Sequence, residues 1–254
     1  MRRLFMGCWM LGIAAALLVL PLHGAAPSAE VASAKAGDVM PAFREGDRIL
    51  FQGDSITDGN RGRNADPNHI LGHGYVFVVS AQYGAMLPER HLTFMNRGIS
   101  GNKVSDLAQR WQADTIALKP NLLSIMIGVN DLNAAPPVRP EIFEQQYDQL
   151  LADTVKALPE VRLVLCEPFG LPVGKKKDGW EAYRAELEKR QAVVAKLGDK
   201  YKCPVVHLQK VFDDACKRAP ADYWIWDGIH PTYSGHQLVA DEWVKVVKEF
   251  WRGK

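Results

Sequence analysis

The chain has 254 residues, 47% of them hydrophobic, enough to bury the core of one sizeable globular domain. Its net charge of +2 excludes the strongly basic surface expected of a nucleic-acid partner site. The one basic run, Lys175-Lys176-Lys177, is expected to be a solvated loop. We find no internal repeat and no long linker.

The N-terminal segment has the layout of a secretory signal peptide. Arg2 and Arg3 precede an apolar stretch over residues 4–22, and small residues follow it. We therefore expect a signal peptide at 1–34 and a mature domain at 40–254, exported to the periplasm or outside the cell. An uncleaved anchor is the alternative, because the apolar stretch could nearly span a bilayer. After cleavage we expect no stable association with a membrane.

Five apolar runs of strand length then alternate with helical patterns. Nearly continuous apolar runs are typical of strands covered on both faces, and strand–helix alternation predicts a parallel sheet. We expect an α/β fold, a doubly wound five-stranded sheet with strand order 2-1-3-4-5 and helices on both faces. The expected strands are 48–54, 92–98, 121–128, 161–169 and 204–209, and the expected helices are 74–86, 104–118, 140–157, 178–200 and 232–250.

Ser55 follows the first expected strand, where ligands of such sheets bind. A serine hydroxyl becomes a good nucleophile when a histidine takes its proton and a carboxylate orients that histidine. Near the C-terminus, Asp227 and His230 lie three residues apart, just before the last expected helix. This order predicts a Ser–Asp–His catalytic set. The serine is not in a Gly-x-Ser-x-Gly elbow, which counts against the usual α/β-hydrolase arrangement.

Acyl transfer also needs hydrogen-bond donors for the developing oxyanion. Three candidates follow strand ends: the backbone N–H groups of Ser55 and Gly98 and the side-chain amide of Asn130. A glycine at position 98 would let the backbone approach a ligand closely.

Four sequence blocks carry a family resemblance. They are GDS at 53–55, Gly98 within NRGISGN, GVND at 128–131 and DGIHP at 227–231. In this order and at strand ends, they resemble the four signatures of the SGNH, or GDSL, hydrolases. The resemblance implies a flavodoxin-like three-layer sandwich, Ser55 as nucleophile, Gly98 and Asn130 in the oxyanion hole, and Asp227 with His230 as orienter and base.

Five longer segments carry a narrower resemblance: GDSITD, LGHGYV, NRGISGN, SIMIGVND and WDGIHPT. Together these phrases look like the acetyl-xylan and acetyl-xylooligosaccharide esterases of the same family. The resemblance implies an acetylated carbohydrate as substrate. The relatives are intracellular, whereas this chain is expected to be exported. The substrate could therefore be either the polymer or short oligosaccharides.

Three further residues are placed at the substrate site. Trp226 is favoured among the aromatic residues before Asp227, because aromatic faces pack on sugar rings; the alternative is core packing. Asp54 is expected mainly as a structural hydrogen-bond acceptor, and His73 as part of a loop beside the site. His69 and His73 have a spacing seen in zinc sites, but the glycines around His73 disfavour a helix, and we expect no metal and no cofactor.

Three cysteines would remain after signal cleavage. Cys203 and Cys216 could form a disulfide in an exported protein, whereas Cys166 lies in an apolar run and is expected to be buried.

The leading hypothesis is a serine esterase that removes acetyl groups from xylan-type sugars. One alternative keeps the chemistry but takes a lysophospholipid, aryl ester or thioester. Two others are a flavodoxin-like module that binds phosphate or flavin, and a catalytically inactive carbohydrate-binding relative. A phosphate loop is disfavoured because Asp54 and Asp58, the second of which is expected as a turn residue, would repel a dianion. A homo-oligomer is possible, although no sequence pattern shows it.

Overall fold

The structure, a computed structural model, describes residues 39–253, which belong to one compact unit, Ala34–Lys254. The signal peptide expected at 1–34 lies outside the described residues. The strands are β1 (Arg48–Gly53), β2 (Thr93–Asn96), β3 (Leu122–Met126), β4 (Arg162–Cys166) and β5 (Val205–Val206). The helices are α2 (Ser55–Asp58), α3 (Tyr75–Met86), α4 (Val104–Asp114), α5 (Val129–Asn133), α6 (Pro140–Ala157), α7 (Trp180–Tyr201), α8 (Leu208–Ala215), α9 (Ala221–Trp224) and α10 (Tyr233–Trp251). Short 3-10 turns are η1 (Pro88–Arg90), η2 (Ile116–Leu118) and η3 (Gly174–Lys176).

The five strands form one parallel sheet with the order β2-β1-β3-β4-β5, which confirms the expected order. β1 lies between β2 and β3, with Phe51 opposite both Asn96 and Ser124. The strand order therefore reverses beside β1, and the carboxyl end of β1 is the point where such sheets bind ligands.

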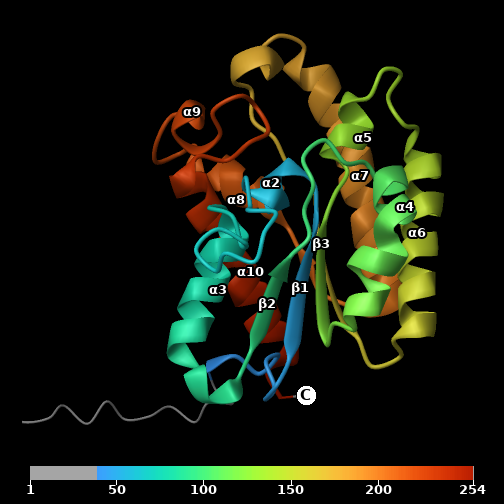
Figure 1. The fold of residues 1–254 in the computed structure, drawn as a ribbon. Coiled ribbons are helices and arrows are strands. Elements are labelled where there is room, and N and C mark those ends of the chain that lie inside the picture. The colour runs from blue at the N-terminus through green and yellow to red at the C-terminus, as the bar shows by residue number, and fades with distance from the viewer. Residues whose placement is uncertain (1–38, 254) are drawn as a thin grey trace, which may run out of the picture. The chain divides into compact units, whose positions relative to one another are not determined.

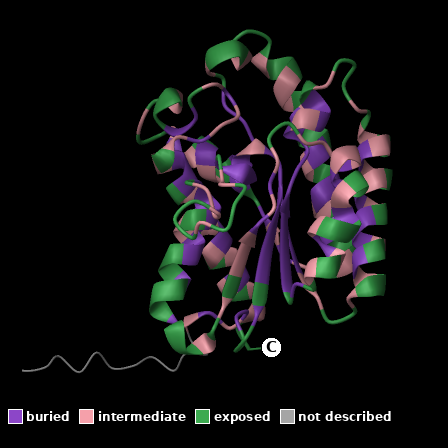
Figure 2. Cartoon of the chain, viewed as in Figure 1, coloured by how far each residue is buried: buried purple, intermediate pink, exposed green. Residues whose placement is uncertain are grey.

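Helices cover both faces of this sheet, as Figure 1 shows. One buried apolar cluster joins the sheet to α3, α8 and α10, and a second joins its other face to α4, α6 and α7. Figure 2 shows the central strands as a buried layer between the two sets of helices, whereas the edge strand β2 is only partly buried. Among the helices of residues 39–253, none combines the length and apolar character that crossing a bilayer requires.

The main departure from the expected elements lies at residues 204–209. The paired strand β5 has two residues, and α8 begins at Leu208. The buried positions Leu208, Phe212 and Ala215 recur at the spacing of one helix face, so the apolar residues continue as a helix rather than a strand. The short helices α2, α5 and α9 were also not expected from the sequence.

The cysteine pairing is corrected by the fold. Cys203 and Cys216 are both free, and they pack against different apolar clusters, which lie on opposite faces of the sheet. A disulfide needs the two Cα atoms within about 7 Å, so this arrangement excludes the pairing. Cys166 is fully buried at the end of β4, as expected.

Trp243 fastens α10 to the sheet. It is the largest fully buried side chain, and its Nε1 donates a hydrogen bond of 2.9 Å to Ser124 Oγ on β3. Its ring also packs against Phe43 and Phe51, with centroids 6.3 and 5.4 Å away. Because α10 follows the loop that carries His230, this contact helps fix that loop at the sheet edge.

We expect Trp243→Phe to lower the free energy of unfolding by about 1–3 kcal/mol, because it removes a buried hydrogen bond and leaves space unfilled. Chemical denaturation monitored by circular dichroism measures the loss. Trp251→Phe, at the half-buried end of the same helix, is the matched control and should cost much less. Equal losses in the two variants would contradict the anchoring role.

Candidate active site

Ser55 is presented by the sharp junction between β1 and α2. β1 ends at Gly53, and α2 begins at Ser55 after the single residue Asp54. The Asp54 carboxylate caps the helix by accepting the Ile56 N–H at 3.0 Å. This cap stabilises the first turn, so the serine hydroxyl is held at the carboxyl edge of the sheet.

Asp54 is itself buried, with 1% of its surface exposed. Burial raises its pKa to about 7, against the lowering effects of the Ile56 N–H and the nearby His230. The expectation of a structural acceptor agrees with this geometry. The expected contact between Asp54 and the substrate disagrees with it, because no face of the side chain is open to a ligand in this structure.

Asp227 and His230 are held by a tight hairpin before α10. Ile225 pairs with Pro231 in an antiparallel bridge, and the Trp226 N–H donates to the His230 carbonyl at 3.1 Å. Inside the hairpin, Asp227 Oδ1 accepts the backbone N–H groups of Ile229 and His230 at 3.1 and 2.8 Å. The loop therefore fixes the carboxylate before any ligand arrives.

The second carboxylate oxygen of Asp227 contacts the imidazole. Asp227 Oδ2 lies 2.6 Å from His230 Nδ1. Burial of Asp227 favours its neutral form, but the hydrogen bonds from His230 and Ile229 outweigh burial and lower its pKa. An ionised Asp227 accepts a hydrogen bond from Nδ1–H, which keeps the proton on Nδ1 and leaves Nε2 as the basic nitrogen.

That basic nitrogen faces the serine: Ser55 Oγ lies 2.8 Å from His230 Nε2. The structure thus brings together the three residues that the sequence analysis selected, across 175 positions of sequence. The distances are those of an acid–base–nucleophile chain in which imidazole can take a hydroxyl proton.

The expected oxyanion donors are only partly available. Asn130 gives one amide N–H to the Asn102 carbonyl at 3.1 Å, and within residues 39–253 its second N–H finds no acceptor. Among the described residues, no acceptor is found for the Ser55 N–H. The Gly98 N–H, by contrast, already donates to Asn96 Oδ1 at 2.9 Å.

Gly98 therefore has another reason to be glycine. A Cβ at this position would lie 2.3 Å from the Asp58 backbone nitrogen, so the missing side chain lets the end of β2 pack on α2. The expectation that Gly98 donates to an oxyanion is corrected by this geometry.

Gly101 is the better placed glycine of NRGISGN. It has φ +84°, a conformation that glycine adopts without strain, and it lies in the turn closed by the Asn102 N–H and the Ile99 carbonyl. No acceptor for the Gly101 N–H is found among the described residues. The carbonyl of the next residue, Asn102, accepts a hydrogen bond from the Asn130 side chain. The sequence contains two glycines three residues apart, and only the backbone geometry shows which of them can donate to an oxyanion.

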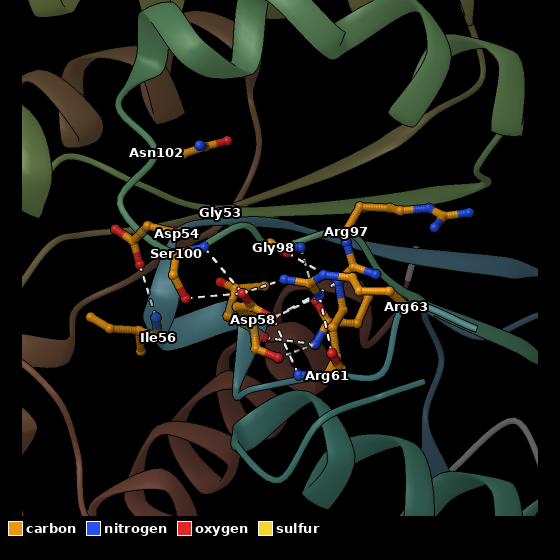
Figure 3. Close-up of polar contacts among 12 residues, drawn as sticks. Gly53, Asp54, Ile56, Asp58, Arg61, Arg63, Arg97, Gly98, Ser100 and Asn102 are labelled. Carbon is orange, nitrogen blue, oxygen red and sulfur yellow. Dashed lines mark hydrogen bonds and ion pairs between the residues drawn. The ribbon is translucent and has the colours of Figure 1, made fainter. Parts of the chain in front are cut away.

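Asp58 is a site residue that the sequence analysis missed, since it was interpreted as a turn residue. Its side chain is buried and binds Arg63 through two hydrogen bonds of 3.0 and 2.7 Å, as Figure 3 shows. Its Oδ2 also accepts the backbone N–H and the hydroxyl of Ser100, at 3.1 and 2.9 Å. Asp58 thereby ties α2 to the turn that carries Gly101.

A surface pocket of about 600 Å³ is lined by Asp227, the outermost member of the Ser55–His230–Asp227 set, and by Ile229 of the same hairpin. Trp226 lines it with 64% of its surface exposed, and its ring stacks beside the His230 ring at 6.2 Å. Lys176 also lines it and lies over the Tyr183 ring at 4.1 Å, so the lysine run is only partly the solvated loop that was expected. Asn130 completes the polar wall.

The remaining candidates lie at the margin. His73 is exposed in the loop before α3, and its backbone N–H donates to the Gly59 carbonyl. His69 is exposed and lies 3.7 Å from Asp66. Trp111 is buried and donates to Thr154, and Trp224 is buried too, so both are packing residues.

A parallel α/β sandwich with a serine–histidine–aspartate chain at its carboxyl edge has the architecture of a serine hydrolase. Residues 51–238 match the sequence model of the GDSL-like lipase/acylhydrolase family. The chain belongs to this family and is a carboxylic ester hydrolase with the SGNH fold.

Several relatives carry more specific names. An acetylxylan esterase of Geobacillus stearothermophilus is 33% identical over 214 residues, which cover 81% of this chain and 96% of that protein. A solved structure of an acetyl-xylooligosaccharide esterase variant from Geobacillus gives a TM-score of 0.72 at 31% identity, covering 81% and 96% of the two chains. A GDSL-like lipase structure from Parabacteroides merdae gives 0.75 at 35% identity, covering 82% and 98%.

The pKa of Asp54 gives a test of the site's electrostatics. The folded protein keeps the Asp54 proton up to pH about 7, whereas an unfolded aspartate loses it near pH 4. Stability from this group is therefore present below pH about 4 and is lost as the pH rises to about 7. Asp54→Asn retains the capping oxygen but cannot ionise, so its stability relative to wild type should rise by more than about 1 kcal/mol across that range.

Denaturation at pH 4.5 and pH 8 measures this difference. Asp178→Asn, in an exposed loop, is the control and should show no comparable trend. A stability difference for Asp54→Asn that stays constant with pH would mean that Asp54 is ionised throughout.

Proposed function

We propose that this protein is a serine acetylesterase that removes acetyl groups from xylan-type poly- or oligosaccharides. The observation that carries the proposal is the continuous chain from Ser55 Oγ through His230 to Asp227, with distances of 2.8 and 2.6 Å. The names of the relatives support an acetylated sugar as substrate.

In the proposed mechanism, Ser55 Oγ attacks the carbonyl carbon of the acetyl group. His230 Nε2 takes the hydroxyl proton, and the ionised Asp227 stabilises the imidazolium that forms. The tetrahedral intermediate collapses when His230 returns the proton to the departing sugar oxygen. The products of this half-reaction are a free sugar hydroxyl and acetyl-Ser55.

The second half-reaction uses the same groups. His230 takes a proton from water, the hydroxide attacks the acetyl carbonyl, and the proton returns to Ser55 as acetate leaves. In both tetrahedral intermediates the negative oxygen is stabilised by N–H donors. We assign these to the backbone of Ser55 and Gly101 and to the free amide N–H of Asn130.

Sugar binding is assigned to the pocket beside the hairpin. The exposed Trp226 ring offers an apolar face to the C–H groups of a sugar ring, and Asn130 and Lys176 offer hydrogen-bond donors at its wall. Export, expected from the first 34 residues, would place the enzyme where polymeric substrate occurs.

The first test is acetate release from acetylated xylo-oligosaccharides. Wild type should release acetate, and Ser55→Ala should lose at least about 10³-fold in kcat, because the nucleophile is gone. Cleavage of 4-nitrophenyl acetate by the same preparations is the control for an intact site. Ser55-dependent cleavage of the aryl ester without acetate release from the sugars would retain the mechanism and overturn the substrate.

The second test separates sugar binding from chemistry. Trp226→Ala should raise KM for acetylated xylo-oligosaccharides about five- to tenfold, through loss of ring contact, and should change kcat/KM for 4-nitrophenyl acetate by less than about threefold. Tyr223→Ala, an exposed aromatic of the same segment, is the matched control. Equal losses on both esters would assign Trp226 to support of His230 instead.

A further inference from the structure

A second pocket lies at the carboxyl end of the edge strand β2, beside the loop that follows α2. Its volume is about 460 Å³. Its floor includes the apolar side chains of Ile70, Leu71 and Phe94, and its wall carries three arginines, Arg61, Arg63 and Arg97.

The positive charge of this pocket is only partly balanced. Asp58 faces the arginines and is engaged by Arg63 and Ser100, and the Asp114 carboxylate also acts on Arg61. Arg61 donates to the Gly98 carbonyl at 3.0 Å and stays 4.0 Å from Asp58. In Figure 3 all three arginines lie on the same side of Asp58.

The effect of this crowding is visible at Arg61. Its pKa is lowered to about 10, first by burial and then by the positive charges of Arg63 and Arg97, against the opposing effects of Asp58 and Asp114. An added anion would relieve this repulsion.

Arg97 supplies an independent observation. Its Nε is buried and has no hydrogen-bond partner among the described residues. The buried Nε is itself closed to a ligand, but Arg97 lines the pocket, and no acceptor for its guanidinium is found among the described residues. The main chain of Arg97 is fixed, because its N–H donates to Phe51 and its carbonyl accepts from Arg110.

We propose that this pocket binds the carboxylate of a uronic acid residue carried by the acetylated carbohydrate chain. The inference rests on the proposed function for its substrate class. A guanidinium fork matches a planar carboxylate, and the apolar floor suits the C–H face of a sugar ring.

The pocket is connected to the catalytic edge through short contacts. The Gly98 carbonyl that accepts from Arg61 belongs to the same loop as Ser100 and Gly101. Asp58 ends the single-turn helix that Ser55 begins. In this proposal, a branched chain bound at Trp226 extends across this loop to the arginines.

The test compares acetylated xylo-oligosaccharides with and without a glucuronic acid branch. Wild type should show a higher kcat/KM for the branched substrate than for the unbranched one. Arg97→Gln should reduce the ratio of these two kcat/KM values about five- to tenfold. Arg97→Lys keeps the charge without the fork and should retain part of the preference. Arg139→Gln, at an exposed position outside the pocket, should leave the ratio unchanged.

Binding is measured separately by calorimetry on the Ser55→Ala protein, so that it does not depend on turnover. The glucuronate-branched oligosaccharide should bind more weakly when Arg97→Gln is added and when salt is raised. Unchanged binding would overturn the inference. Free glucuronate that binds as tightly as the branched chain would also overturn it, in favour of a general anion site.

The two proposals fail differently. If neither oligosaccharide is deacetylated while 4-nitrophenyl acetate is cleaved, the proposed substrate is wrong. The calorimetry alone then decides whether the arginine pocket binds the uronic acid. If both oligosaccharides are deacetylated equally by wild type and Arg97→Gln, the proposed function stands and the acidic subsite is wrong. Circular dichroism of each variant excludes loss of fold as the cause.

Discussion

The backbone hydrogen bonds that place β1 between β2 and β3 are the constraint on which the site depends. They force three chain segments to leave the sheet at one edge, so that Ser55, the Gly98–Asn102 loop and Asn130 lie together. The fourth segment, the hairpin of Asp227 and His230, belongs to another part of the chain. It reaches the same edge because α10, which follows it, packs on the sheet through Trp243. The catalytic distances are therefore consequences of sheet register and helix packing.

The pKa values of two carboxylates near the imidazole are shifted in opposite directions by their surroundings. Asp227 is partly buried but accepts three hydrogen bonds, and its pKa is lowered. Asp54 is buried with one backbone donor, and its pKa is raised to about 7. Negative charge is therefore concentrated on the Nδ1 side of His230, where it stabilises the imidazolium. A second charge beside Ser55 is suppressed, so Asp54 can cap α2 without opposing the developing oxyanion.

Much of the fold and of the site follows from the sequence because the signals are local. Apolar runs with helical patterns between them predict the parallel sheet, and polar residues at the run ends predict where the site lies. Other features depend on contacts that no local pattern contains. Gly98 and Gly101 look equivalent until the Asn96 side chain takes the N–H of the first. Asp58 reads as a turn residue until Ser100, 42 positions away, donates to it. Cys203 and Cys216 are near in sequence, but a β-strand and a helix place them on opposite faces of the sheet.

Asp58 has a wider consequence for the active site. Its Oδ2 accepts from Arg63 and from both the backbone and hydroxyl of Ser100, so one carboxylate holds the arginine pocket and the donor turn. Hydrogen bonds that share an acceptor compete for its charge, so one of them strengthens when the other donor finds another partner. An anion that draws Arg63 away from Asp58 would leave more of that charge to Ser100 and would tighten the turn that carries Gly101. The pocket and the oxyanion donors are in this sense one hydrogen-bonded unit, built around a residue that takes no part in the chemistry.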